Sequence, residues 1–147
     1  MRKALYVFVV VLVAAVSWAA YYAISPIFIH IEANEALPGA QKNTSATAPV
    51  VSTIGHPASG TARVVQAEGA TYVRYENFQT INGPDIYVYL SKDLDAKDFI
   101  DLGKVRATEG NINYEIPREV NVADYKYVLT WCKQFGVLFN YADISAT

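Results

Sequence analysis

The residue best suited to chemistry in this sequence is Cys132. It is the only cysteine among 147 residues, and it directly follows Trp131, one of two tryptophans. One cysteine cannot form an intramolecular disulfide, and it cannot hold structural zinc without several other ligands. The thiol is therefore free to react, to bridge a second molecule or to ligate a bound group, unless it is a buried apolar residue of the core.

Cys132 lies in the stretch 127–141, which predicts a strand, a turn at residues 134–136 and a second strand. Because side chains alternate along a strand, Cys132 and Trp131 lie on opposite faces. If Trp131 faces the core, Cys132 faces outward beside Lys133, whose ammonium group would favour the reactive thiolate. If Cys132 faces inward, it is an inert packing residue, and the residue types alone favour this arrangement. A bulge at the turn would exchange the two faces.

A second donor for haem iron would be a histidine or a methionine. His56, in a Gly-His-Pro turn, is the only histidine outside the apolar amino-terminal region, because His30 lies between two isoleucines close to that region. A site formed by Cys132 and His56 could ligate haem, although a plain loop residue is the simpler interpretation of His56. The sequence contains no CxxCH motif, which excludes covalent c-type haem.

The acidic residues have structural interpretations. Asp85 follows Gly83 and Pro84 at the start of a predicted strand, where its carboxylate can accept hydrogen bonds of the turn. The three aspartates in residues 93–98 have a weak calcium-like spacing, but the glycine and terminal glutamate of a calcium loop are missing, so we expect a solvated turn without metal. No hydrolytic triad, Walker loop or dinucleotide motif occurs, so no conventional enzyme is predicted.

Aromatic residues are numerous, and the chain contains 11 tyrosines. Several of them follow strand spacing and are expected to share a surface near Trp131. Such a cluster can relay electrons, but it more often packs a sheet. The members of the expected surface are Tyr87, Tyr89, Tyr114, Tyr125 and Tyr127.

The amino terminus predicts a membrane anchor. Residues 4–24 carry no charge, and as a helix they would span roughly 30 Å, about one hydrocarbon core. Arg2 and Lys3 precede this run, which predicts a cytoplasmic amino terminus and a single-pass protein with its domain outside the cytoplasm. The alternative is a signal peptide cleaved near Ser17-Trp-Ala19, followed by secretion. We favour the anchor because the apolar run continues beyond that point.

The remainder predicts one small all-β domain. We assign residues 1–24 to the anchor, 25–52 to a juxtamembrane segment and linker that holds the domain off the bilayer, and 53–147 to the domain. About seven short alternating segments, separated by turn residues, are typical of a small antiparallel β-sandwich or barrel. The net charge is −2 and there is no basic patch, so nucleic-acid binding is not expected.

Four blocks resemble the signature of the DM13 domain family, in the family's order. They are residues 83–91 (GPDIYVYLS), 102–104 (LGK), 110–117 (GNINYEIP) and 131–139 (WCKQFGVLF). The layout is similar to that of prokaryotic members with one amino-terminal span. The matching positions besides the cysteine are Gly83, Pro84, Asp85, Tyr87, Tyr89, Tyr114, Pro117, Trp131, Lys133 and Phe135.

The resemblance implies a place in cell-surface electron transfer. DM13 domains are proposed to act with DOMON and cytochrome b561-type modules, and their signature cysteine, which matches Cys132, is proposed to be a bare thiol or a ligand to a group such as haem. Because neither of those modules is recognisable in these residues, we expect a separate protein as electron partner. The rival hypothesis is a cell-surface binding module that uses its tyrosine-rich face, with Cys132 structural.

Overall fold

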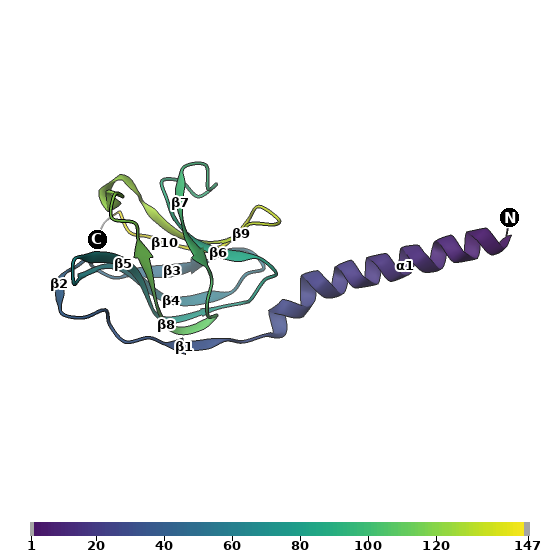
Figure 1. Cartoon of the computed structure of the whole chain (residues 1–147), viewed down its shortest axis with the longest axis horizontal. Coiled ribbons are helices and arrows are strands. Elements are labelled where there is room, and N and C mark those ends of the chain that lie inside the picture. Colours follow the sequence, from purple (N-terminus) through teal and green to yellow (C-terminus); the bar gives the residue numbers. More distant parts are fainter. Residues whose placement is uncertain (1, 146–147) are drawn as a thin grey trace.

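The computed structural model describes residues 2–145, apart from the side chains of residues 27 and 41–44. Helix α1 (Arg2–Ile24) projects from one end of a β domain and buries none of its residues (Figure 1). It is long and apolar enough to cross a membrane, and it is the only such helix among the described residues. A short 3-10 helix, η1 (Ser25–Phe28), follows, because Pro26 lacks the N–H group that the α-helix would need.

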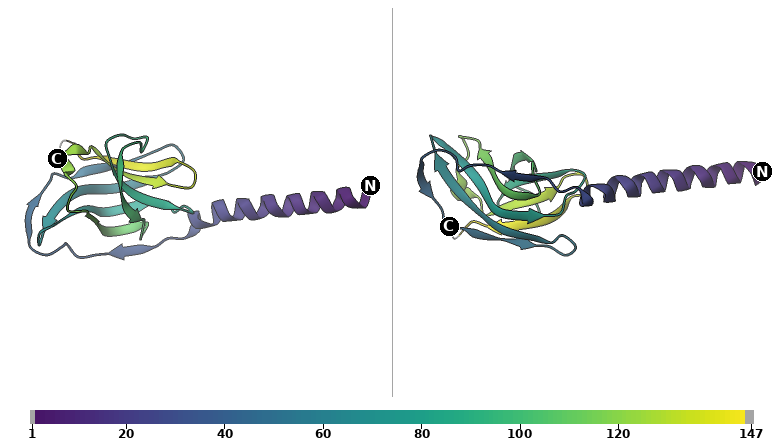
Figure 2. Two further views of the ribbon diagram at one scale, coloured as in Figure 1. Left: turned by 45° about the horizontal axis from the view of Figure 1, so that its top comes forward. Right: turned by 90° about the horizontal axis from the view of Figure 1, so that it is seen from below.

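The described residues of the domain form one ten-stranded sheet that curls on itself (Figures 1 and 2). The path along the sheet is β1-β8-β5-β4-β3-β10-β9-β6-β7, and β2 pairs with β4 outside this path. A 3-10 helix, η2 (Val122–Asp124), precedes β9. The strands are β1 (Glu32–Asn34), β2 (Gln41–Thr44), β3 (Ala48–Ser52), β4 (Ala58–Ala67), β5 (Ala70–Thr80), β6 (Ile86–Ser91), β7 (Phe99–Lys104), β8 (Glu109–Ile116), β9 (Tyr127–Cys132) and β10 (Val137–Asp143).

The expected hairpins are present. Strands β4 and β5 pair antiparallel around Glu68 and Gly69, whose φ angles of 51° and 80° suit the primed turns of β-hairpins. Strands β9 and β10 pair around a turn that contains Gly136, with a φ angle of 62°. The predicted all-β, mainly antiparallel, barrel-like domain behind one apolar helix is therefore confirmed. Strand β1 is the exception, since it pairs parallel to β8.

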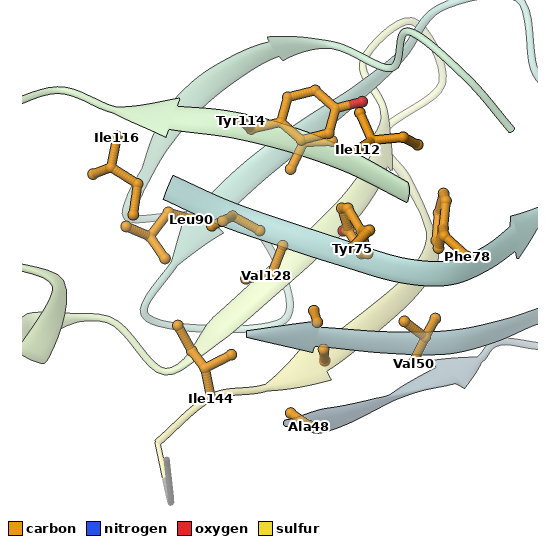
Figure 3. Packing of buried hydrophobic residues seen from close by; sticks show 14 of the residues in the cluster. Ala48, Val50, Tyr75, Phe78, Leu90, Ile112, Tyr114, Ile116, Val128 and Ile144 are labelled. Carbon is orange, nitrogen blue, oxygen red and sulfur yellow. The ribbon is translucent and has the colours of Figure 1, made fainter. Parts of the chain in front are cut away.

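The core lies inside the curled sheet, where alternate residues of facing strands meet (Figure 3). Tyr75 and Phe78 of β5 contact each other with ring centroids 4.3 Å apart, and Tyr114 of β8 meets Tyr75 edge-on at 6.2 Å. Val88 and Leu90 of β6 are fully buried against this aromatic group, as the alternation along that strand predicts. Buried residues from seven of the ten strands thus converge on one apolar interior.

The segment 25–52, for which composition predicts a linker, contributes three strands to the sheet. Ala48 and Val50 of β3 are buried in the core, and β3 pairs with both β4 and β10. Its alanine, proline, serine and threonine content is typical of linkers, yet these residues fit a pleated surface where partner strands are supplied from elsewhere in the chain. In the part of this segment that the structure describes, β1, β2 and β3 therefore belong to the sheet.

We use the name strap for residues 29–37, which connect η1 to the barrel. The carbonyl oxygen of Ile31 accepts hydrogen bonds from the backbone N–H groups of Thr108, at 2.8 Å, and Glu109, at 3.1 Å. Further along the strap, Glu35 Oε2 accepts from the N–H of Asn113 at 2.8 Å. Arg74, only 5% exposed, donates to the carbonyl oxygens of Glu35 and Ala36, both at 3.3 Å. The strap is thereby held along β8 over its length.

Candidate functional site

Cys132 ends strand β9 and is completely buried, with an exposed fraction of 0%. Alternation holds along β9, so Cys132 faces the interior with Val128 and Thr130, which are also buried. The bulge in this hairpin lies in β10, between Leu138 and Asn140, and not at the turn. Of the two arrangements predicted for Cys132, the structure shows the inward one.

The surroundings of Cys132 form a small second core at the α1 end of the barrel. Cys132 packs there with Ile86, its register partner on β6, and with Phe139. Phe139 lies at the β10 bulge, and its ring stacks on the imidazole of His56 with centroids 4.1 Å apart. A single phenyl ring therefore links the two donor residues singled out in the sequence.

Cys132 and His56 line one pocket of about 290 Å³. Part of the wall is backbone of Gly55 and Gly83 together with the polar residue Asn82. The other wall residues are apolar: Ala23, Ile81, Pro84, Phe135, Val137 and Phe139. Two larger hollows, of about 450 and 700 Å³, are wide grooves elsewhere on the barrel and contain neither Cys132 nor His56. The smaller pocket is where a soft sulfur donor, an imidazole and an apolar lining meet.

The hydrogen bonds of His56 determine which ring nitrogen is available. Thr53 Oγ1 lies 2.8 Å from the carbonyl oxygen of Leu138 and 2.7 Å from that of Phe139, so its single hydrogen is donated to these acceptors. The same oxygen lies 3.3 Å from His56 Nδ1, which must then carry the proton and donate it. With the proton on Nδ1, a neutral imidazole would keep the lone pair of Nε2 for a ligand.

The comparisons with known proteins agree with this domain. The sequence profile of the family described as "Electron transfer DM13" matches residues 50–144, more than half of the chain. The chain belongs to the DM13 family. Searches of curated proteins and of solved structures find no significant match. The family resemblance predicted from the four sequence blocks is thus confirmed, and the pocket lies inside the matched DM13 domain except for Ala23.

Lys133 does not lie beside the thiol, contrary to the outward arrangement considered from the sequence. Its ammonium nitrogen lies 4.8 Å from the centre of the Tyr87 ring and 3.5 Å from Asp101 Oδ2. Tyr87 is the register partner of Trp131, so this group lies on the face of β9 opposite to Cys132. Lys133 therefore contributes to the outer face of the DM13 domain and not to the pocket.

The tyrosines divide between two locations. Tyr87 and Tyr89 of β6 pair in register with Trp131 and Leu129 of β9. Tyr89 is buried and stacks on Phe99 at 4.1 Å, and burial together with the negative charge of Asp101 raises its pKa to about 12. Tyr114 instead lies in the main core and accepts a hydrogen bond from the N–H of Arg106. The expected common surface thus excludes Tyr114.

The GPD block forms the loop between β5 and β6 that closes one side of the pocket. A Cβ atom on Gly83 would lie 2.9 Å from both Phe139 Cζ and Ile86 Cγ2, so only glycine fits without displacing the pocket wall. The carbonyl oxygen of Asp85 accepts from the N–H of Lys133 at 2.9 Å, which joins this loop to the β9–β10 turn. The Asp85 carboxylate lies 3.8 Å from the Lys104 ammonium.

Of the remaining predicted positions, only Phe135 lines the pocket. Pro117 directly follows β8, and Phe135 is half exposed at the tip of the β9–β10 turn. The Asp93 carboxylate accepts backbone N–H groups of Asp95 and Lys97 at 2.9 and 3.1 Å, which stabilises a solvated turn. Among the described residues, no group of three or more His, Cys, Asp or Glu side chains could hold a metal ion.

Sequence analysis missed the pocket walls formed by Ile81, Val137 and Phe139. Val137 is the register partner of Cys132, so it follows from the predicted hairpin. The position of Phe139 could not be predicted in this way, because the β10 bulge makes its side chain depart from the alternation of a regular strand.

Proposed function

We propose that this DM13 protein is a membrane-anchored, extracytoplasmic redox accessory whose pocket uses Cys132 and His56 as ligands for a bound group. The observation that carries the proposal is that the only cysteine and the only histidine of the DM13 match line the same apolar pocket. The family's description as an electron-transfer domain supports the redox class. The apolar helix α1, which begins with the basic residues Arg2 and Lys3, supports anchoring with the domain outside the cytoplasm.

The buried position of Cys132 favours a ligand role over a bare thiol that reacts with other proteins. A disulfide exchange partner must reach the sulfur directly, and a thiol with 0% exposure offers no surface to a macromolecule. A small group in the pocket would lie against partly exposed His56, and it would reach Sγ once the side chains that cover Cys132 moved aside. The apolar walls would exclude water from that group, which strengthens its electrostatic interactions and affects its redox potential.

Haem fits the donors in kind, since thiolate and imidazole are both axial ligands of haem iron, and a bound haem would supply one-electron transfer. The pocket volume of about 290 Å³ is just below the roughly 300–1,000 Å³ usual for small-molecule sites. The β3–β4 and β9–β10 turns would have to separate to admit a macrocycle. In this arrangement Cys132 and His56 would hold the iron, and Phe139 and Pro84 would contact the ring.

The test uses the full-length protein in detergent, purified under reducing conditions and titrated with ferric haem. We expect a shifted Soret band that is lost in Cys132→Ser and displaced in His56→Gln. The matched control is His30→Gln, which changes the histidine outside the pocket and should leave the spectrum unchanged. Absence of a band in the wild-type protein, or equal spectra in all variants, would refute a ligand role for this pair.

One observation favours a second function, a cell-surface binding module with Cys132 structural. Trp131, Tyr87 and Tyr127 lie partly exposed on the outer face of β6 and β9, and aromatic residues with a polar end are common at protein interfaces. A colourless protein whose thiol is labelled only after unfolding would support this function over the first.

A further inference from the structure

Three turns meet at the end of the barrel from which α1 leaves. They are residues 53–57 between β3 and β4, 81–85 between β5 and β6, and 133–136 between β9 and β10. All three contribute to the pocket, and so does Ala23 in the last turn of α1. Figure 2 shows the β9–β10 turn, in yellow, on the side of the domain nearest to the helix. The mouth of the pocket and the end of the apolar helix are therefore neighbours.

Large apolar side chains are exposed at this end. Ile54, at the tip of the first turn, is 100% exposed, and Phe135, at the tip of the third, is 53% exposed. Between them and α1, Phe28 and Ile29 of the connection are 76% and 53% exposed. These four residues continue the exposed apolar surface of α1 onto the domain. Large contiguous apolar surfaces mark sites of interaction with a partner or a membrane, so an apolar partner is indicated.

The strap keeps the domain close to the helix. Asn82 of the second turn donates to the carbonyl oxygen of Ile29 at 3.3 Å, and Ile31 is hydrogen-bonded to Thr108. Only residues 25–28 lie between α1 and the first of these contacts, and they form η1. A domain held this way cannot be displaced far from the membrane that α1 would span.

Charged residues are most concentrated at the end of the barrel that is distant from α1. The turn with the densest charge, residues 92–98, follows the far end of β6, whose first residue, Ile86, packs beside Cys132. With six residues of about 3.3 Å each, β6 separates that charged turn from the pocket end by roughly 20 Å. The densest charge thus lies far from the helix, whereas the turns beside the helix carry only Asp85 and Lys133, each within 4 Å of an oppositely charged side chain.

We propose that the apolar end of the barrel docks on the bilayer that α1 spans, with Ile54 and Phe135 inserted at the lipid interface and the pocket mouth at the membrane surface. The proposal rests on the membrane anchor of the proposed function, and it does not depend on whether the pocket binds a redox group. The partner is the lipid of the same membrane, because the four exposed apolar residues are continuous with α1. The domain then lies on the membrane and is not held away from it.

The experiment places single cysteines in the full-length chain, in a Cys132→Ala background, and labels them with an environment-sensitive nitrobenzoxadiazole probe. The positions are Ile54→Cys, Phe135→Cys and, as matched control in the distal charged turn, Lys97→Cys. The proteins are reconstituted in phosphatidylcholine nanodiscs, and quenching by lipids with a nitroxide on the acyl chain is compared with quenching by a water-soluble nitroxide. A fourth label at Ala14→Cys reports insertion of α1.

We expect lipid quenching at positions 54 and 135 to be at least threefold stronger than at position 97, and aqueous quenching to show the reverse order. Equal quenching at all three positions, with strong lipid quenching at position 14, would overturn docking while leaving the anchor intact. Weak lipid quenching at position 14 as well would overturn the anchor and docking together. Should the Cys132→Ala background fail to fold, Cys132→Ser keeps nearly the native side-chain volume and serves as the second background.

Discussion

Arg74 connects the strap to the barrel, and its replacement by methionine should destabilise both. The guanidinium donates to Glu76 Oε1 at 2.9 Å, to Asn113 Oδ1 at 2.8 Å and to two strap carbonyl oxygens at 3.3 Å. Methionine retains much of the apolar stem but none of these donors. The change therefore isolates the hydrogen bonds of a nearly buried cation from its packing.

The expected loss follows from the number and burial of these bonds. A hydrogen bond to a charged group contributes about 1.5–3 kcal/mol, and removing one partner of a buried ion pair costs about 3–5 kcal/mol. Glu76 keeps a second partner, because Arg63 lies 2.7 Å from the same oxygen. We therefore expect the free energy of unfolding to fall by about 3 kcal/mol. With a urea m-value of about 2 kcal/mol/M, the midpoint would shift by roughly 1.5 M.

The pH dependence provides a second test. Burial opposes ionisation of Glu76, but the hydrogen bonds from Arg74 and Arg63 outweigh it and hold the pKa below its ordinary value of 4.5. A lowered folded-state pKa contributes stability that is present above the unfolded-state value and is lost as the pH falls through the folded-state value. The stability difference between wild type and Arg74→Met should therefore be constant near neutral pH and shrink as the pH falls below 4.5.

The assay is urea unfolding of the full-length protein in detergent, followed by tryptophan fluorescence, together with limited proteolysis of the strap. Arg118→Met is the matched control, since Arg118 is exposed and its replacement should change stability by less than about 0.5 kcal/mol. The proposed role of Arg74 in holding the strap is refuted if Arg74→Met shifts the urea midpoint no more than Arg118→Met does, or if the strap is cleaved equally slowly in both variants.

Three further predictions concern the strap and the pocket. Gly110→Ala should release β1, because the added Cβ atom would lie 2.2 Å from the Ala33 carbonyl oxygen. The matched control is Gly103→Ala, since Gly103 has the same φ of 107° but an added Cβ atom there would meet nothing within 4 Å. We expect faster proteolysis of the strap only in Gly110→Ala, and equal rates in the two variants would contradict the contact. Gly83→Ala should displace Phe139, lower stability by about 1–3 kcal/mol and speed native labelling of Cys132, and an unchanged labelling rate would show that Phe139 does not limit access. In the wild type, Cys132 should react with a bulky maleimide at least tenfold more slowly when native than in urea, and fast native labelling would contradict its burial.

Local pattern predicted much of the sheet but could not choose between its two faces. The β4–β5 hairpin and the Gly136 turn follow from turn residues between alternating segments, and both are present. Alternation correctly separated Cys132 from Trp131, yet it left open which residue faces inward. Which of the two residues faces inward depends on the pairing of β9 with β6, where Ile86 is the register partner of Cys132. The residues around Cys132 in the sequence do not reveal such a long-range pairing.

The strap and the pocket could not be predicted from local sequence patterns, because both depend on long-range contacts. Strand β1 has three residues and gains its stability from parallel pairing with β8, far away in the chain. His56 and Cys132 were linked in the sequence only by elimination of other donors. They line one pocket because the β10 bulge places Phe139 between them, and the spacing of residues in the sequence does not predict this bulge.

The pairing of β3 with β10 determines when this domain can complete its fold. The strand that opens the DM13 match lies beside the strand that closes it, so the centre of the sheet remains incomplete until residue 143 is available. Such non-local pairings make folding slow, because the loop must close before its contacts form. Until β10 is added, β3 and β9 each keep one unpaired edge, and such edges can pair with strands of other chains and cause aggregation.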